Sequence, residues 1–165
     1  MRTRSPLILS VCLSLLLSAC GWQLRNAQVV PEDLGRLHLS AQDPHSKLIT
    51  ELTRALNLYG VDVVASAADA KYSVVIVDFK RTRRSATLNP SARVSEFQLN
   101  EEVDFLIVDA LGNQIIPLST ASIERVYEFN ERDVLASESE ERLIRDGMRE
   151  ELVRQILNRL SVVPQ

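Results

Sequence analysis

The sequence predicts an α+β fold in which two helices pack on one face of a mainly antiparallel sheet of four to five strands. The order of expected elements leads to this prediction: strand, helix, several consecutive strands, then a long helix. The helical segments carry apolar stripes, whereas the long strands alternate apolar and polar residues. With 165 residues, 45% hydrophobic and 25% charged, the chain has the size and composition of one globular domain.

Two short strands are expected on either side of the first helix. Residues 34–40 form the first, because Leu37 and Leu39 alternate with polar neighbours. Residues 61–64 form the second, directly after the helix. The first helix is therefore enclosed by strands that it connects.

The first helix is expected to open at Asp43-Pro44. Aspartate is a good N-cap, and proline suits the first helical position because it has no N–H to leave unpaired. Gly60 is a typical stop. The apolar stripe between them consists of Leu48, Ile49, Leu52, Ala55, Leu56 and Tyr59.

Three longer strands are expected in the middle of the chain, at residues 71–84, 91–109 and 115–129, with a hairpin turn at 111–113 between the last two. The middle strand has the clearest period of two, and Glu101 interrupts its apolar face. The opposite face is polar and is free to meet solvent or a partner. The apolar positions are Phe97, Leu99, Val103, Phe105 and Ile107.

A final amphipathic helix is expected from Ser137, which forms a possible capping box with Glu140. The polar face of this helix mixes acidic residues with arginines and has no interfacial Trp, which favours packing on a core over lying on a membrane. Its apolar positions recur every four residues at Ile144, Met148, Leu152, Ile156 and Leu160.

The first nineteen residues have the pattern of a lipoprotein signal peptide that is removed. Arg2 and Arg4 precede an apolar run at residues 7–17, which at 1.5 Å per residue is about 16 Å long. That run is too short for a hydrocarbon core of ~30 Å. The following Leu-Ser-Ala-Cys20 resembles the lipobox of bacterial lipoproteins. A plain secretory signal cut after Ala19 is the alternative.

The lipobox implies cleavage before Cys20 and lipidation of its thiol and its new amine. Residues 20–33 are then a lipidated tether and residues 34–165 a single domain. Two or more acyl chains anchor a protein stably. In bacterial lipoproteins an aspartate after the cysteine often retains the protein at the inner membrane. Gly21 therefore favours the outer membrane, with the domain facing the periplasm.

Several function classes are disfavoured. A formal charge of −3 and a pI near 5.5 give no basic footprint for nucleic acid. Two His and two Cys leave little for a metal site, so we expect no metal or cofactor. The motifs of serine hydrolases, zinc proteases and P-loop enzymes are missing, and His38 is interpreted as a surface residue. The chain is not expected to be an enzyme.

One local concentration of positive charge stands out. Its members are Lys80, Arg81, Arg83, Arg84 and, beyond a loop at residues 84–91, Arg93. Along a strand, Arg81 and Arg83 share one face, and Lys80 and Arg84 share the other. Guanidinium groups suit bidentate phosphate binding. The alternative is a solvated strand end that discourages edge-to-edge aggregation.

Nearly all of the mature chain resembles the LptE family of lipopolysaccharide-assembly lipoproteins. A helix at residues 46–59 followed by Gly60-Val61, the long strands and the final helix match the order of that family. The mature N-terminus looks like the family's opening, with Trp22 in the aromatic place: it reads Cys20-Gly21-Trp22-Gln23-Leu24-Arg25.

The resemblance implies a protein that sits as a plug inside the outer-membrane barrel LptD, helps that barrel to fold, and binds lipopolysaccharide during delivery to the outer leaflet. It implies that basic residues near the tip of the middle strands contact lipopolysaccharide. The nearest equivalents here are Arg81, Arg83, Arg84 and Arg93.

Two other functions remain as alternatives. One is a periplasm-facing lipid-binding lipoprotein without a barrel partner. It would need an apolar pocket for acyl chains, and the strand pattern offers no surplus apolar face. The other is a lipoprotein hydrolase, which the missing motifs disfavour.

Overall fold

The computed structural model describes residues 34–163. The predictions for residues 1–19, for the tether at 20–33 and for lipidation of Cys20 lie outside this part. A five-stranded sheet has the order β2-β1-β3-β4-β5. The strands are β1 (Arg36–Ser40), β2 (Asp62–Val64), β3 (Tyr72–Leu88), β4 (Val94–Asp109) and β5 (Gln114–Glu128). The helices are α2 (Lys47–Leu58) and α3 (Val134–Leu160), with a 3-10 turn η2 (Ala67–Asp69) before β3.

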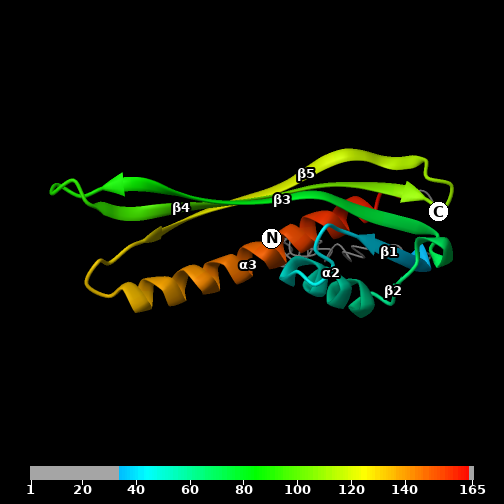
Figure 1. The fold of residues 1–165 in the computed structure, drawn as a ribbon, viewed down its shortest axis with the longest axis horizontal. Coiled ribbons are helices and arrows are strands. Elements are labelled where there is room, and N and C mark those ends of the chain that lie inside the picture. The colour runs from blue at the N-terminus through cyan, green and yellow to red at the C-terminus, as the bar shows by residue number, and fades with distance from the viewer. Residues whose placement is uncertain (1–33, 164–165) are drawn as a thin grey trace, which may run out of the picture.

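Both helices lie on the same side of the sheet (Figure 1), which we call its inner face. The strands β3, β4 and β5 pair antiparallel, whereas β1 pairs parallel to both β2 and β3. A parallel pair requires a crossover connection, which α2 supplies between β1 and β2. The predicted α+β class, with two helices on a mainly antiparallel sheet, is confirmed.

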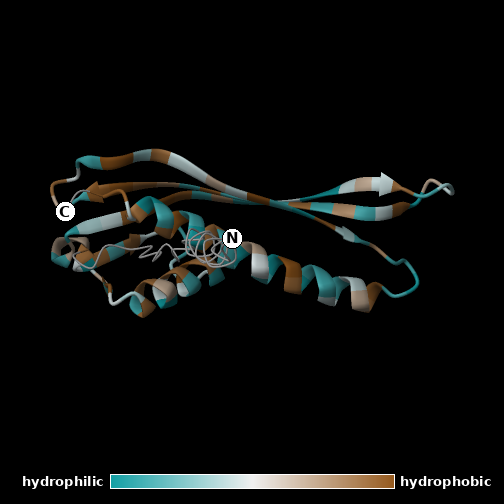
Figure 2. Ribbon diagram, turned by 180° about the vertical axis from the view of Figure 1, so that it is seen from behind, coloured by the Kyte–Doolittle hydropathy of each residue, from teal (hydrophilic) through white to brown (hydrophobic). Residues whose placement is uncertain are grey.

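One hydrophobic core lies between the inner face and the two helices. The period of two in β4 places Leu99, Val103 and Phe105 in this core, each no more than 1% exposed. Apolar and polar residues accordingly alternate along the strands (Figure 2). The helices contribute their predicted stripes, which include Leu48, Leu52 and Leu56 from α2 and Met148, Leu152, Ile156 and Leu160 from α3.

A β-bulge in β3 decides which way its charged residues face. The register with β4 shifts between Ile76 and Asp78, so that Val77 is the extra residue. Ile76 pairs with Phe105, and Phe79 pairs with Val103. Phe79 therefore returns to the inner face, and every second residue after it follows. Without the bulge, the alternation that starts at Ile76 would turn Asp78 inward instead.

The β3–β4 hairpin is longer than expected. Residues 84–91 were predicted as a loop, but β3 continues to Leu88 and the turn occupies residues 89–93. The side chain of Asn89 accepts hydrogen bonds from the backbone N–H of Ser91 and Arg93, at 2.9 and 3.1 Å. Because the Asn89 side chain closes this tight turn, the strands remain paired almost to the tip.

Both helix starts differ from the prediction. Ser46, not Asp43, caps α2 by accepting a hydrogen bond from Ile49 N–H. In α3 the cap is Asp133, whose carboxylate accepts from Ala136 N–H at 3.1 Å. The expected capping box at Ser137 is therefore wrong, since Ser137 is buried inside the helix and accepts from Asn130 N–H. Each start offers more than one good capping residue in the sequence: Asp43 and Ser46 for α2, and Asp133 and Ser137 for α3.

The long helix α3 has 27 residues, and its two halves have different surroundings. Apart from Ser137, its buried residues all lie from Met148 onward. Figure 1 shows the helix close to the sheet in its C-terminal half and diverging from it toward its N-terminus. Within residues 34–163, no helix is both long enough and apolar enough to cross a membrane.

Candidate functional site

The predicted basic residues do not form one cluster, because the register divides them between the two faces of the sheet. Arg81 and Arg83 pair with Glu101 and Leu99, which are both buried, and therefore face inward. Lys80 and Arg84 face outward, as the alternation predicts. Arg93 lies apart from all four, at the end of the hairpin turn.

On the outer face, the charge of Lys80 is balanced by two carboxylates. Its Nζ lies 3.3 Å from Asp78 Oδ2 and 3.7 Å from Asp104 Oδ2. The hydrogen bond and charge of Asp78, and then the charge of Asp104, raise the pKa of Lys80 above its ordinary value. Arg84 is exposed and forms no ion pair with any residue from 34 to 163. Of these two cations, Arg84 is the one available to an anion.

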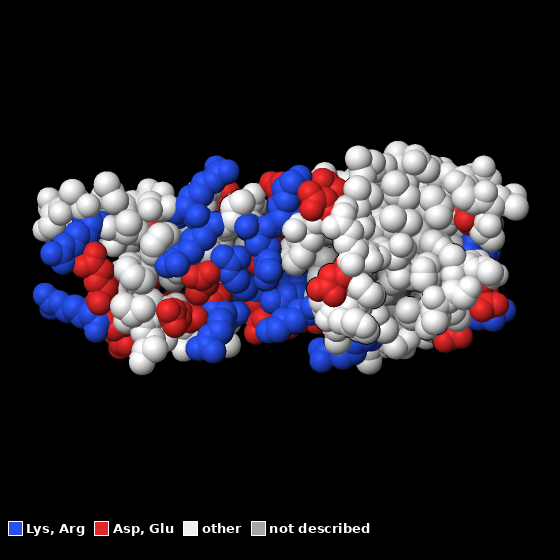
Figure 3. All heavy atoms as spheres, viewed as in Figure 1, with Lys and Arg blue, Asp and Glu red and all other residues white. Residues whose placement is uncertain are grey.

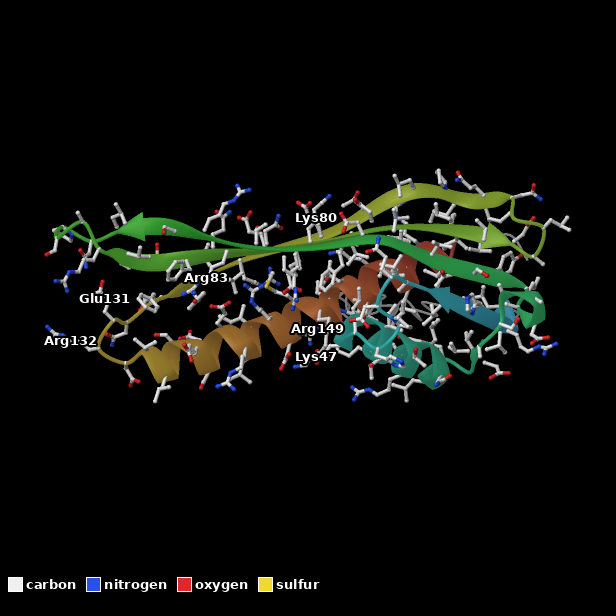
Figure 4. The ribbon with its side chains drawn as sticks, viewed as in Figure 1. Lys47, Lys80, Arg83, Glu131, Arg132 and Arg149 are labelled. Atoms are coloured by element: carbon white, nitrogen blue, oxygen red, sulfur yellow. The ribbon has the colours of Figure 1, made fainter. Side chains whose placement is uncertain are left out.

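On the inner face, Arg83 stacks on an aromatic pair. Its guanidinium carbon lies 3.6 Å from the centroid of the Phe97 ring, a cation–π contact. Phe129 packs edge-on against Phe97, with ring centroids 5.1 Å apart. The Nε of Arg83 lies 3.4 Å from Glu141 Oε2 on α3. Figure 4 accordingly shows Arg83 between the sheet and α3, with Lys80 on the opposite side of the sheet.

Arg83 belongs to a network that we call the Glu141 cluster, which consists of Arg83, Glu101, Tyr127, Glu141 and Arg145. Arg145 donates to Glu101 Oε1 at 3.0 Å and to Glu141 Oε1 at 2.8 Å. Tyr127 donates its hydroxyl proton to Glu141 Oε2 at 2.7 Å. Glu101 is 0% exposed. Glu101 therefore interrupts the apolar pattern of β4 because it forms a buried ion pair with Arg145 of α3.

The pKa shifts in the Glu141 cluster favour an ionised Glu141 and a protonated Tyr127. Burial alone would raise the pKa of Glu141, but hydrogen bonds from Tyr127 and Arg145 and the charges of Arg145 and Arg83 lower it below its ordinary value. Burial, followed by the hydrogen bond to Glu141, raises the pKa of Tyr127 to about 12. At neutral pH Glu141 is thus ionised and Tyr127 keeps the proton that it donates.

Arg81 lines a pocket of about 440 Å³ beside the start of α2. Its guanidinium carbon lies 5.5 Å from the ring centroid of Phe79. Lys47 and Arg149 line the same pocket. Arg149 is bonded to Glu51 and Asp146, at 3.0 and 2.9 Å. Sequence reasoning missed Lys47 and Arg149, because they come from two helices far apart in the chain.

At the far end of the hairpin, Arg93 shares a pocket of about 490 Å³ with Arg132, which the sequence analysis missed. Arg93 Nη1 lies 2.9 Å from Glu131, a residue of the loop between β5 and α3. Figure 4 shows Glu131 and Arg132 in this loop. The polar lining includes Asn89, Ser91, Ser95 and Asn130.

The two pockets are lined by guanidinium groups together with hydroxyl and amide groups. Guanidinium groups bind phosphate, and hydroxyl and amide groups bind sugar hydroxyls. Figure 3 shows basic side chains gathered across the middle of one face, interspersed with acidic ones, while the end with α2 is largely uncharged.

Nδ1 of His38 lies 3.1 Å from the carbonyl oxygen of Val64. Among residues 34–163, no three His, Cys, Asp or Glu are placed to hold a metal.

The sequence matches known proteins along most of its length. A family model described as LptE, lipopolysaccharide-assembly, matches residues 34–160. The LPS-assembly lipoprotein LptE of Photorhabdus laumondii is 24% identical, over 99% of this chain and 88% of the relative. That of Pectobacterium atrosepticum is 26% identical, over 90% and 80%.

Two solved structures share the fold. The solution structure of lipoprotein B from Nitrosomonas europaea superposes with a TM-score of 0.72 at 26% identity, covering 86% of this chain and 90% of that one. The crystal structure of rare lipoprotein B from Shewanella oneidensis gives 0.67 at 26% identity, covering 76% and 92%. The arrangement of helices and strands is therefore common to several bacterial lipoproteins.

Proposed function

Because the chain belongs to the LptE family of lipopolysaccharide-assembly proteins, we propose that it is an outer-membrane lipoprotein that plugs and assembles the barrel LptD. In this proposal it also binds lipopolysaccharide during delivery to the outer leaflet. Cys20 carries the lipid anchor, and residues 20–33 connect it to the domain. The alternative is a lipid-binding lipoprotein without a barrel.

The polar outer face of the sheet is the observation that best supports the plug. The lumen of a large outer-membrane barrel is polar, so a plug must present polar side chains rather than a second apolar layer. Along the three paired strands β3, β4 and β5, most outward positions beyond the bulge meet this requirement, with Val126 as an apolar exception. They include Lys80, Thr82, Arg84, Gln98, Asn100, Glu102, Asp104, Thr120, Ser122 and Glu124.

A mild-detergent pull-down of the tagged full-length protein from native outer membranes tests the plug. We expect a large β-barrel protein to be recovered in near-stoichiometric amount, because a plug is enclosed by its partner. Recovery of the lipoprotein alone, under conditions that keep other barrel complexes intact, would contradict the proposal. That result would favour the free lipid-binding protein.

For lipopolysaccharide we propose the far end of the hairpin as the principal contact. Lipid A carries phosphates, and Arg93 and Arg132 line one pocket together with hydroxyl and amide groups. Arg84 supplies a further exposed guanidinium on β3. Lys80 is held by two carboxylates, and Arg83 would first have to leave Glu141 and the Phe97 ring. Among the described residues, Arg93 has a single carboxylate partner, Glu131, and its side chain is 66% exposed. Arg81 is the remaining candidate, on the inner face.

The double variant Arg93→Gln, Arg132→Gln is expected to weaken lipopolysaccharide binding about tenfold or more, since charge-assisted hydrogen bonds contribute about 1.5–3 kcal/mol each. The melting temperature should change little, because Arg93 and its partner Glu131 are largely exposed. The measurement is binding to lipopolysaccharide micelles at fixed ionic strength.

The matched control is Arg54→Gln, which removes an exposed arginine from α2. It should leave lipopolysaccharide binding unchanged. Undiminished binding by the double variant would show that the far end is not the contact. An equal loss of lipopolysaccharide binding in Arg54→Gln would show that net charge, rather than the position of the arginines, determines binding.

A further inference from the structure

The N-terminal half of α3, residues 134–146, is not held by the hydrophobic core. Of its side chains only Ser137 is buried, and Ile144 packs partly against the core. Leu135 and Leu143 are 78% and 73% exposed. The C-terminal half, by contrast, contributes a continuous buried stripe from Met148 to Leu160. The two halves therefore depend on different interactions.

What joins residues 134–146 to the sheet is mainly the Glu141 cluster. Glu141 forms an ion pair with Arg83 of β3 and accepts a hydrogen bond from Tyr127 of β5. Arg145 forms an ion pair with Glu101 of β4. These contacts are ionic or hydrogen-bonded, so they are lost when one partner is neutralised or taken by another ion. A single carboxylate, that of Glu141, links two strands and Arg145.

The boundary between the halves is Gly147. A Cβ added there would meet no atom within 4 Å, so the exposed side of the helix at Gly147 faces open space. Glycine also weakens a helix interior relative to alanine. An isolated helix of about thirteen residues is marginal in water. Residues 134–146 would therefore lose helical structure on leaving the sheet, while the packed half stays.

We propose that residues 134–146 form an arm that opens from the sheet as a unit, and that a phosphate group taking Arg83 from Glu141 favours the open state. The second part rests on the proposed binding of lipopolysaccharide, and the first does not. In the closed state Arg83 is shared between Glu141 and the Phe97 ring. Phosphate competes for the same guanidinium with more charge than a carboxylate. Opening also uncovers Phe97 and Tyr127.

Hydrogen–deuterium exchange of the full-length protein, read by mass spectrometry, tests the arm. In Glu141→Gln, amides of residues 134–146 should exchange about tenfold faster or more, because a charge-assisted hydrogen bond contributes enough to shift the opening equilibrium by that factor. Exchange in residues 148–160 should not change. Glu140→Gln, an exposed neighbour with the same charge change, is the control.

A second variant, Arg83→Gln, removes the cation from the other side of the contact at a residue that is 40% exposed. It should accelerate exchange in the same residues. Unchanged exchange of residues 134–146 in both variants, or equal acceleration in both halves of α3, would overturn the arm.

Lipopolysaccharide micelles added to the wild-type protein should accelerate exchange of residues 134–146. In Arg83→Gln, adding the micelles should cause no further acceleration. The same measurement with inorganic phosphate, at equal phosphate concentration, shows whether a phosphate group alone accelerates this exchange or whether the assembled lipid is required. If lipopolysaccharide binds but exchange of residues 134–146 does not accelerate, the proposal that phosphate favours the open arm is overturned. Absence of lipopolysaccharide binding would instead contradict the proposed function, and the two variants would still decide on the arm.

Discussion

Replacing Arg145 by methionine is expected to lower the free energy of unfolding by about 3–5 kcal/mol, the range for breaking a buried ion pair by removing one partner. Arg145 is the hydrogen-bond donor to Glu101, whose side chain is 0% exposed. The other carboxylate oxygen of Glu101 is buried and has no partner among the described residues. The variant therefore leaves a buried charge uncompensated. Urea denaturation at pH 7 measures the loss.

Two further variants separate the charge of Glu101 from the packing of α3. Arg142→Met, at an exposed position of the same helix, should change stability by no more than about 0.5 kcal/mol. The double variant Glu101→Leu, Arg145→Met should recover most of the loss, because well-packed apolar residues often replace a buried ion pair without cost. A loss below about 1 kcal/mol in Arg145→Met would show that water reaches Glu101, contrary to the expectation.

The fold was predictable because its main signals are local. The alternation along β4 identified Leu99, Val103 and Phe105 as core residues, and all three are buried. The four-residue spacing of the last helix identified its stripe, including Leu152 and Ile156, in the same way. Side-chain direction in a regular strand or helix follows from residue spacing alone. No knowledge of the neighbouring elements was needed.

The features that sequence reasoning missed depend on contacts between elements. The bulge at Val77 results from how β3 and β4 match in register, which neither strand specifies alone. The partner of Glu101 is 44 residues away, on another element. The extension of β3 to Leu88 depends on pairing with β4, which overrides the loop character of residues such as Ser85.

Only part of the candidate site was predictable, because its remaining features also depend on contacts between elements. A dense run of cations at residues 80–84 is visible in the sequence, but the carboxylates that bind its members are not. Asp104 comes from β4 and Glu141 from α3. Arg132, beside Arg93 in the end pocket, had no local signal, since one arginine in an acidic loop is unremarkable until the hairpin is placed next to it.

Replacing Leu152 by alanine is expected to lower the free energy of unfolding by about 2–5 kcal/mol, the range for truncating a buried leucine. Leu152 is 0% exposed and lies in the core between α3 and the sheet. Its loss removes transfer free energy and leaves a cavity that the long sheet can close only in part. Denaturant unfolding followed by circular dichroism measures the change.

Leu143→Ala is the matched control, because it makes the same substitution on the same helix at a residue that is 73% exposed. It should change stability by no more than about 0.5 kcal/mol. Since the helix propensity term is nearly equal at both positions, the difference between the variants measures the packing of the C-terminal half of α3. A comparable loss at Leu143 would mean that residues 134–146 share the core after all, and would leave no separate arm for the Glu141 cluster to hold closed.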